Sequence, residues 1–183
     1  MKQFRFICLM AIAVLVVFTG CSSEEEASGE QEMAFQPADE AAIAEIIESA
    51  SFTDLDGNEV SIRDYRGKVL LIDFWETWCG PCLQVFPAMQ DLREEFPDRF
   101  EVLAVTLGLS EGPEEAKAFR EEHEYDFHFL YDEFEVSNEL GIFSIPYKIY
   151  IGPDGRLIKQ EIGSSGREGD YNRTKEVILE YSE

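Results

Sequence analysis

The sequence has few basic residues. Fifteen lysines and arginines stand against 38 aspartates and glutamates, and the formal net charge is −23. Nucleic-acid binding depends on a basic surface that neutralises phosphates, and docking of surface charge onto anionic lipid needs one too. We therefore expect no nucleic-acid partner. An aromatic content of 13% over 183 residues supplies a core for about one domain and argues against a disordered acidic chain.

Cysteine and histidine are also scarce, with four and two copies. Four cysteines in a chain of this length do not make a disulfide scaffold. No second cysteine pair and no histidine pair follows at the spacing of a tetrahedral zinc site. His123 and His128 stand apart, and His128 lies in an apolar run where we expect a surface residue of a strand. The sequence therefore predicts neither a metal nor a cofactor.

Long hydrophobic runs are absent as well. Lys2 and Arg5 precede Phe6–Phe18, a run without charge or proline. It is shorter than the roughly 20 residues that span a bilayer, and a short run behind positive charges is typical of a secretory signal. The run leads into Thr19-Gly20-Cys21, which resembles the lipobox of bacterial lipoproteins. Residues 1–20 would then be removed and Cys21 lipidated; an uncleaved anchor or an ordinary signal peptide is the alternative.

The next segment lacks positive charge, because no lysine or arginine occurs between Ser22 and Ile62. Glutamates gather with serine and glycine in its first part, which is typical of a solvated tether. Isoleucines in residues 39–50 follow helical spacing, with Asp39 as a candidate N-cap. A short helix packed on the domain and a mostly disordered spacer both remain open. We expect a signal peptide (1–20), an acidic tether (21–50) and one folded domain (51–183).

Within the folded domain, apolar patterns predict strands that alternate with helices. Residues 69–75 form a nearly continuous apolar run, as in a strand buried on both faces. Residues 81–96 have helical spacing and end at Pro97. The other predicted elements are a hairpin at 51–58, strands at 101–107, 127–131, 147–151 and 157–162, and helices at 112–123, 133–140 and 169–181. This order predicts an α/β fold in which helices flank a central mixed β-sheet that carries an N-terminal hairpin.

Two cysteines stand where the buried strand turns into a helix. Cys79 and Cys82 are neighbours on one helical turn, so they can bridge and reopen with little backbone movement. The helix N-terminus favours a thiolate at Cys79, and thiolate is the nucleophile in disulfide exchange. Cys82 lies deeper and is suited to resolve a mixed disulfide. An inert bridge would constrain little chain entropy, and haem attachment would need histidine where Leu83 stands.

The stretch from Trp75 to Cys82 (WETWCGPC) resembles the active-site signature of the thioredoxin superfamily. More narrowly, the chain resembles membrane-anchored, extracytoplasmic thioredoxins of the TlpA/ResA type. Further matching motifs are FTDLDG at 52–57, YRGKV at 65–69, LGIFSIP at 140–146 and GPDGR at 152–156. The resemblance covers roughly residues 51–180 and implies a thioredoxin-like fold with thiol-disulfide oxidoreductase activity.

The resemblance also implies roles for individual residues. Pro146 matches a cis proline beside the cysteine pair, and Ile145 would offer backbone groups to an extended client segment. Asp73 matches a buried acid that accepts the proton of the deeper cysteine; a locally hydrogen-bonded strand-end residue is the alternative. We expect the client-binding surface to include Trp78, Gly80, Pro81, Ile145 and Pro146.

Glu76 and Tyr147 depart from the family pattern. Glu76 replaces a small residue, and a carboxylate close to Cys79 would raise the pKa of the thiol. We expect its side chain to point into solvent. Tyr147 replaces a threonine and could narrow or reshape the client groove, so the client preference of the family is not carried over to this chain. Of the two tryptophans, Trp75 is expected in the core and Trp78 partly exposed.

The Gly-Pro between the cysteines matches reducing thioredoxins. It favours a reductase of client protein disulfides that is re-reduced by a membrane electron donor. Cytochrome c maturation is a common task in the family. Three alternatives stay open: an oxidase or isomerase of the same fold, a peroxidase on the related peroxiredoxin scaffold, and a non-enzymatic surface lipoprotein that acts as a binding module. The usual Pro-x-x-x-Thr-x-x-Cys arrangement of the peroxidase is absent.

Overall fold

The computed structural model describes residues 40–182. The predicted signal peptide, the lipidation site Cys21 and the candidate N-cap Asp39 lie outside this range. The helices are α1 (Glu40–Ser49), α2 (Gly80–Glu95), α3 (Pro113–Glu122), α4 (Val136–Glu139) and α5 (Gly166–Tyr181), with a 3₁₀ turn η1 (Ile62–Tyr65). The strands are β1 (Ser51–Asp54), β2 (Glu59–Ser61), β3 (Val69–Trp75), β4 (Phe100–Thr106), β5 (His128–Tyr131), β6 (Tyr147–Ile151) and β7 (Leu157–Ile162).

The strands of this part of the chain form one mixed sheet in the order β2-β1-β5-β4-β3-β6-β7. β3 runs parallel to β4 and antiparallel to β6, and every residue of β3 is buried. β1 and β2 form the antiparallel N-terminal hairpin. The predicted mixed sheet, its buried central strand and its hairpin are confirmed.

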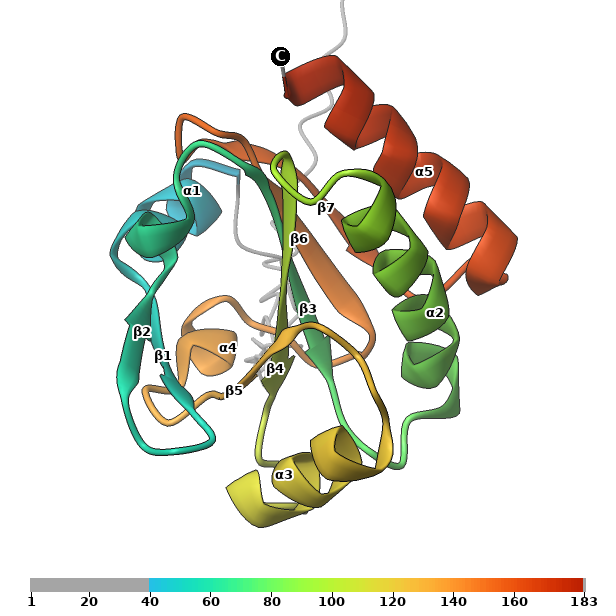
Figure 1. The fold of residues 1–183 in the computed structure, drawn as a ribbon. Coiled ribbons are helices and arrows are strands. Elements are labelled where there is room, and N and C mark those ends of the chain that lie inside the picture. The colour runs from blue at the N-terminus through green and yellow to red at the C-terminus, as the bar shows by residue number, and fades with distance from the viewer. Residues whose placement is uncertain (1–39, 183) are drawn as a thin grey trace, which may run out of the picture. The chain divides into compact units, whose positions relative to one another are not determined.

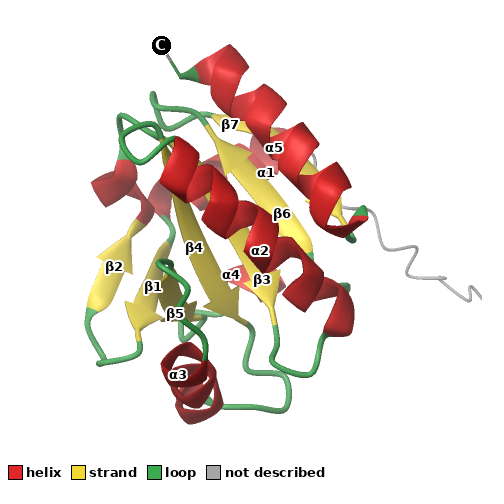
Figure 2. Ribbon diagram, turned by 45° about the vertical axis from the view of Figure 1, so that its right-hand side comes forward, coloured by secondary structure: helices red, strands yellow, loops and turns green. Residues whose placement is uncertain are grey.

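Helices cover both faces of the sheet. Figures 1 and 2 show α2 and α5 side by side on one face, with α1 and α4 on the other. Side chains alternate between the faces along a strand. Leu71 and Trp75 of β3 therefore pack with α2 and α5, whereas Ile72 and Phe74 pack with α1 and α4. Trp75 is fully buried, as predicted from the sequence.

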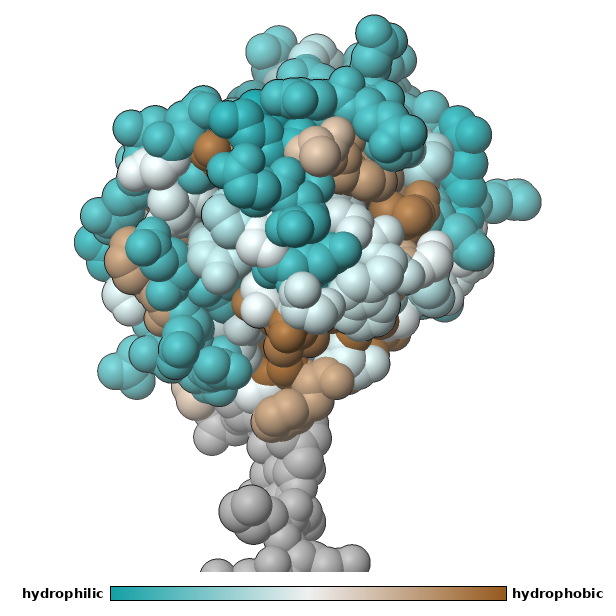
Figure 3. Space-filling model, turned by 90° about the horizontal axis from the view of Figure 1, so that it is seen from below, coloured by the Kyte–Doolittle hydropathy of each residue, from teal (hydrophilic) through white to brown (hydrophobic). Residues whose placement is uncertain are grey.

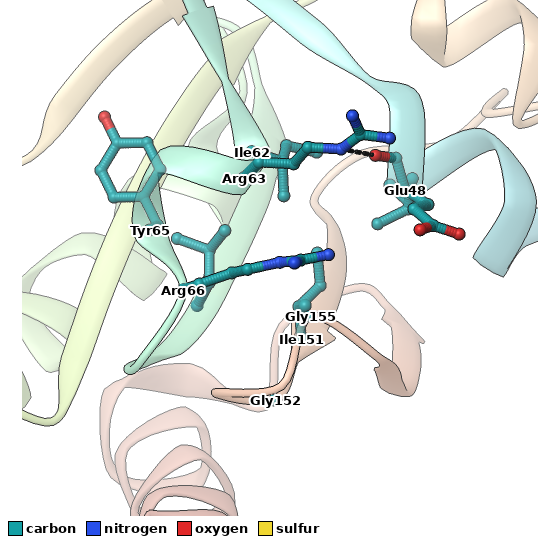
Figure 4. Close-up of a pocket in the computed structure, with 10 residues that line it drawn as sticks. Glu48, Ile62, Arg63, Tyr65, Arg66, Ile151, Gly152 and Gly155 are labelled. Carbon is teal, nitrogen blue, oxygen red and sulfur yellow. Dashed lines mark hydrogen bonds between the residues drawn. The ribbon is translucent and has the colours of Figure 1, made fainter.

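Helix α1 is part of the folded domain. Its residues Ile43 and Ile47 are buried in the core on the α1 face of the sheet. Figure 4 shows Arg63 of η1 directed toward Glu48, and its Nε atom donates a hydrogen bond of 2.9 Å to the Glu48 carbonyl oxygen. The cavity beside them measures about 10 Å³, room for one water molecule at most. Of the two interpretations left open for residues 39–50, the packed helix is correct.

None of the helices in residues 40–182 combines the length and the apolar character that a membrane span requires.

Candidate active site

The cysteine pair lies where β3 passes into α2. Cys79 is the N-cap of α2, and its Sγ atom accepts a hydrogen bond of 3.3 Å from the backbone nitrogen of Cys82. The two residues form a disulfide with their Cα atoms 5.3 Å apart. Cys79 is 4% exposed and Cys82 fully buried. Cys79 is therefore the outer sulfur at the helix N-terminus, which is the arrangement that its expected nucleophilic role requires.

The predicted client-binding residues surround this pair. Trp78 is 56% exposed, and Gly80 and Pro81 are exposed. The Ile145–Pro146 peptide bond is cis, as predicted. Tyr147 is in register with Phe74, so the antiparallel pairing places Pro146 at the end of β3, beside the turn that leads to Cys79. Ile145 is partly buried and packs against the core cluster that contains both cysteines.

Asp73 is buried on the same face of the sheet as the cysteines. It stands between Leu71 and Trp75 on β3, so its side chain faces the layer of α2 in which Cys82 is buried. Neither carboxylate oxygen has a hydrogen-bond partner among the described residues. Complete burial disfavours the charged form and raises the pKa of Asp73 to about 8, although the Lys148 ammonium opposes the rise. Because this pKa lies close to neutral pH, part of the Asp73 population is ionised there, and this ionised form can accept a proton.

Lys148 and Asp170 lie beside Asp73 and were missed from the sequence. Lys148 is in register with Asp73 across β3 and β6, and is 1% exposed. Its Nζ atom lies 2.6 Å from Oδ1 of Asp170, a buried residue of α5. The sequence Tyr-Lys-Ile-Tyr-Ile at 147–151 is typical of a strand with one solvent-exposed face. It therefore does not predict that helices cover β6 on both faces.

The prediction that Glu76 points into solvent is wrong. Its side chain is fully buried, and its Oε1 atom accepts a hydrogen bond of 3.2 Å from the backbone nitrogen of Leu109. Burial raises the pKa of Glu76, with a smaller contribution from the Glu111 carboxylate. The partner is 33 residues away in the sequence, so no local pattern could have indicated this contact.

The two residues after Glu76 also bind the loop that follows β4. The Thr77 backbone nitrogen and hydroxyl both donate to the Glu111 carboxylate, the hydroxyl at 2.5 Å. The Trp78 indole nitrogen donates to the Ser110 hydroxyl at 3.0 Å. Three consecutive residues before Cys79 therefore fix the loop at residues 109–111 next to the disulfide.

Tyr147, the second departure from the family pattern, is also a buried residue. Tyr147 is 6% exposed, and its ring packs against Phe74 in the core on the α1 face of the sheet. Its hydroxyl donates to the side-chain oxygen of Gln160. The tyrosine ring therefore lies on the face of the sheet away from the cysteines and does not line a client groove beside them.

Apolar side chains are exposed around the disulfide. Trp78 precedes Cys79, Leu109 lies on the loop that Glu76 holds, and Phe143 lies on the segment before Pro146. Leu109 is 69% exposed and Phe143 77%. Figure 3 looks onto this end of the domain and shows apolar surface in patches between hydrophilic atoms. Large apolar side chains exposed in this way are typical of a surface that binds another protein.

The prediction for His128 is confirmed. His128 lies on β5 with its side chain 44% exposed and 3.7 Å from Glu101, as expected for a surface residue of a strand. Among residues 40–182, no group of three histidine, cysteine, aspartate or glutamate side chains is arranged to hold a metal ion.

The mixed sheet, the covering helices and the Cys79–Cys82 disulfide define a thiol-disulfide oxidoreductase of thioredoxin-like fold. Comparison with known proteins identifies the group. The chain belongs to the AhpC/TSA family, whose model matches residues 43–160.

Individual relatives agree with this assignment and with the resemblance predicted from the sequence. The thiol-disulfide oxidoreductase ResA of Geobacillus kaustophilus is 33% identical over 128 residues, which is 69% of this chain and 72% of the relative. The thioredoxin-like protein YneN of Bacillus subtilis is 31% identical over 115 residues, 62% of this chain and 68% of the relative. A crystal structure of the thioredoxin domain of a thiol-disulfide oxidoreductase from Bacteroides vulgatus matches with 26% identity and a TM-score of 0.59, covering 70% of this chain and 92% of that domain.

Proposed function

We propose that the protein is an extracytoplasmic, lipid-anchored reductase of client protein disulfides. The observation that carries the proposal is the pairing of a disulfide at a helix N-terminus with a fully buried carboxyl group, Asp73, on the face of the sheet that the cysteine helix covers. The Gly80-Pro81 pair between the cysteines and the relatives named thiol-disulfide oxidoreductase support it. No cofactor takes part, because the cysteines themselves carry the electrons.

The reaction begins with the reduced protein. The Cys79 thiolate attacks one sulfur of a client disulfide, and the client's second sulfur leaves as a thiolate that takes a proton from water. Asp73 accepts the proton of the Cys82 thiol. The Cys82 thiolate then attacks the sulfur of Cys79, the Cys79–Cys82 bond forms, and the client's first sulfur leaves as a thiolate. Two electrons pass from the protein to the client.

The client reaches Cys79 along an extended segment. Pro146 and Ile145 are expected to present backbone groups to this segment, and Trp78, Gly80 and Pro81 to form the surface on which it rests. Replacing Cys79 by Ser should abolish reduction of insulin, a standard protein disulfide. Insulin reduction that survives in Cys79→Ser would exclude the mechanism, and loss of it would exclude a binding module without enzymatic activity.

The direction of electron flow is tested by the reduction potential. Equilibration with glutathione should give a value near that of thioredoxin, about −270 mV, since this protein carries the same Gly-Pro pair. A value near that of the oxidant DsbA, about −120 mV, would make the protein an oxidase instead. Turnover of a hydroperoxide at a rate comparable to insulin reduction would point to a peroxidase.

The client is identified by trapping. In Cys82→Ser the mixed disulfide forms at Cys79 but cannot be resolved, so the client stays attached and can be identified by mass spectrometry. We propose an apocytochrome c among the trapped proteins, because cytochrome c maturation requires reduced cysteines before haem attaches. The double variant Cys79→Ser/Cys82→Ser is the matched control and should trap nothing. A Cys82→Ser variant that captures no protein would contradict the reductase function.

The proposed location rests on the segment that precedes helix α1. Residues 1–20 act as a signal peptide, Cys21 carries the lipid, and the acidic segment that follows keeps the domain at a distance from the membrane, where a membrane electron donor re-reduces it. Cys21→Ser should move the protein from the membrane fraction to the soluble extracytoplasmic fraction. Insulin reduction should be unchanged in this variant, since the residue takes no part in the exchange.

A further inference from the structure

A buried ion pair lies beside Asp73 and has no part in the exchange steps described above. Lys148 is 1% exposed and stands opposite Asp73 in the register of β3 and β6. Its ammonium nitrogen lies 2.6 Å from Oδ1 of Asp170, which is also 1% exposed. Burying a lysine and an aspartate costs solvation energy that their attraction often only offsets. A role in the reaction would account for the pair.

Asp170 is held firmly in place at the start of α5. Its carboxylate accepts hydrogen bonds from the Ser164 hydroxyl and from the backbone nitrogen of Ser165, the latter at 3.2 Å. Lys148 is bound to this fixed carboxylate, and a carboxylate oxygen of Glu161 lies 3.8 Å from its ammonium nitrogen. Asp73, although it faces Lys148, has no hydrogen-bond partner among the described residues.

We propose that Asp170 is a positioning residue that holds the Lys148 ammonium away from Asp73, so that the Asp73 carboxylate remains basic enough to take the proton of Cys82. The inference rests on the proton-acceptor role proposed for Asp73. An ammonium bound directly to Asp73 would stabilise its ionised form and weaken its affinity for a proton. Asp170 prevents this by binding the same ammonium.

The charges around Asp73 support the view that Asp170 and Asp73 compete for the Lys148 ammonium. Burial is the largest cause of its raised pKa, the Lys148 ammonium lowers the pKa and Asp170 raises it again. β4 contributes no titratable group in register, because Ala104 stands opposite Asp73. Other titratable side chains that the neighbouring strands place on this face are Tyr150 of β6, whose hydroxyl bonds to Thr174, and Glu161 and Lys159 of β7, which pair with each other at 2.9 Å. The two cysteines of the Cys79–Cys82 pair lie on the same face.

Replacing the two members of the pair one at a time should therefore shift the titration midpoint of Asp73 in opposite directions. We would label the aspartate carboxyl carbons with ¹³C and follow the Asp73 titration in the oxidised protein by NMR, using Asp73→Asn for assignment. Asp170→Asn should lower the midpoint by about one pH unit or more, because the ammonium becomes free to bond Asp73. Lys148→Met should raise the midpoint by a similar amount. If the pair had only a structural role, the Asp73 midpoint would be the same in Asp170→Asn and in Lys148→Met.

Asp91→Asn is the matched control. It removes one negative charge from an ion pair on the surface, between α2 and α5, and leaves Lys148 untouched. The Asp73 midpoint should then stay where it is in the unmodified protein. If Lys148→Met does not fold, Asp170→Asn alone decides, since it keeps the size of the side chain. A midpoint that is unchanged or raised in Asp170→Asn overturns the inference.

A second measurement separates this inference from the function on which it rests. Single-turnover reduction of a disulfide peptide, followed from pH 5 to 10, reports the step in which Cys82 releases the peptide. The pH profile should move to lower pH in Asp170→Asn and to higher pH in Lys148→Met. If Asp73→Asn leaves the profile unchanged, the proposed role of Asp73 fails. If Asp73→Asn changes the profile but the Asp73 midpoint measured by NMR is the same in Asp170→Asn and Lys148→Met, only the role of Asp170 fails.

Discussion

The buried side chain of Glu76 accepts a hydrogen bond from the backbone nitrogen of Leu109, with 3.2 Å between the two atoms. Glu76 lies three residues before Cys79, whose backbone nitrogen donates to the Glu76 carbonyl oxygen at 3.0 Å. One residue thus connects the start of the cysteine helix with the loop that exposes Leu109. This suggests that Glu76 acts on client binding through the loop, and it predicts how two substitutions should differ.

Glu76→Ala should raise the KM for insulin several-fold and leave the reduction of a small disulfide such as 5,5′-dithiobis(2-nitrobenzoic acid) nearly unchanged. The alanine leaves the Leu109 N–H without its acceptor, so the loop loses its fixed position. Glu76→Gln retains an acceptor oxygen and should bind insulin almost as well as the unmodified protein. Steady-state kinetics with both substrates checks the prediction.

The alternative is that Glu76 acts through its charge on the Cys79 thiol. Both substitutions remove that charge, so both would then lower the thiol pKa by the same amount. Thiolate absorbance at 240 nm measures this pKa in each variant. If Glu76→Ala and Glu76→Gln had equal thiol pKa shifts and equal KM values for insulin, Glu76 would act through its charge and not through the hydrogen bond.

Asp73 should make the protein less stable as the pH rises. In the folded protein its pKa is raised to about 8, mainly by burial, whereas its ordinary value is 3.8. Between these values the unfolded chain is ionised while the folded protein keeps the proton, so unfolding releases a proton. The free energy of unfolding should fall by about 1.4 kcal/mol per pH unit in this window from this group alone. Urea unfolding of the oxidised protein between pH 4 and 9 measures it.

Asp73→Asn is the matched variant for this measurement. It cannot ionise, so it should be more stable than the unmodified protein at pH 8 by several kcal/mol and about equally stable at pH 4. Asp73 would be shown to ionise freely in the folded state if the two stability curves ran parallel across the whole range.

The sequence predicts the fold well because its elements are local patterns. The apolar run of β3, the helical spacing of α2 and the turn motif between β6 and β7 each depend on neighbouring residues, and the structure confirms them. Cys79 and Cys82 are likewise found from one short motif. The charged groups around them are different, because their states depend on contacts between distant segments. Glu76 meets residue 109, and Lys148 meets Asp170, so neither burial could be predicted from spacing.

Gly108 holds the loop next to Glu76 in a conformation that requires glycine. Its φ is +75°, and a Cβ atom built there would lie 2.7 Å from the Tyr131 hydroxyl oxygen. Gly108→Ala should therefore combine backbone strain with overpacking and cost about 2–4 kcal/mol of unfolding free energy. Gly57, with φ +87° and nothing within 4 Å of the added atom, separates the two effects. Gly57→Ala should cost about 1–2 kcal/mol, and equal losses in both variants would exclude the steric contribution.

Helix α1 should contribute to the stability of the domain although it follows an acidic segment. Ile47 is 1% exposed and packs in the core with Ile62 and Leu70, so Ile47→Ala should reduce the free energy of unfolding by about 2–5 kcal/mol. Ile46 is only partly buried on the same helix, so Ile46→Ala should reduce the free energy of unfolding by clearly less. Chemical unfolding of both variants decides whether the helix folds with the domain. If Ile47→Ala were no more destabilising than Ile46→Ala, α1 would belong functionally to the tether, and the folded domain would begin at β1.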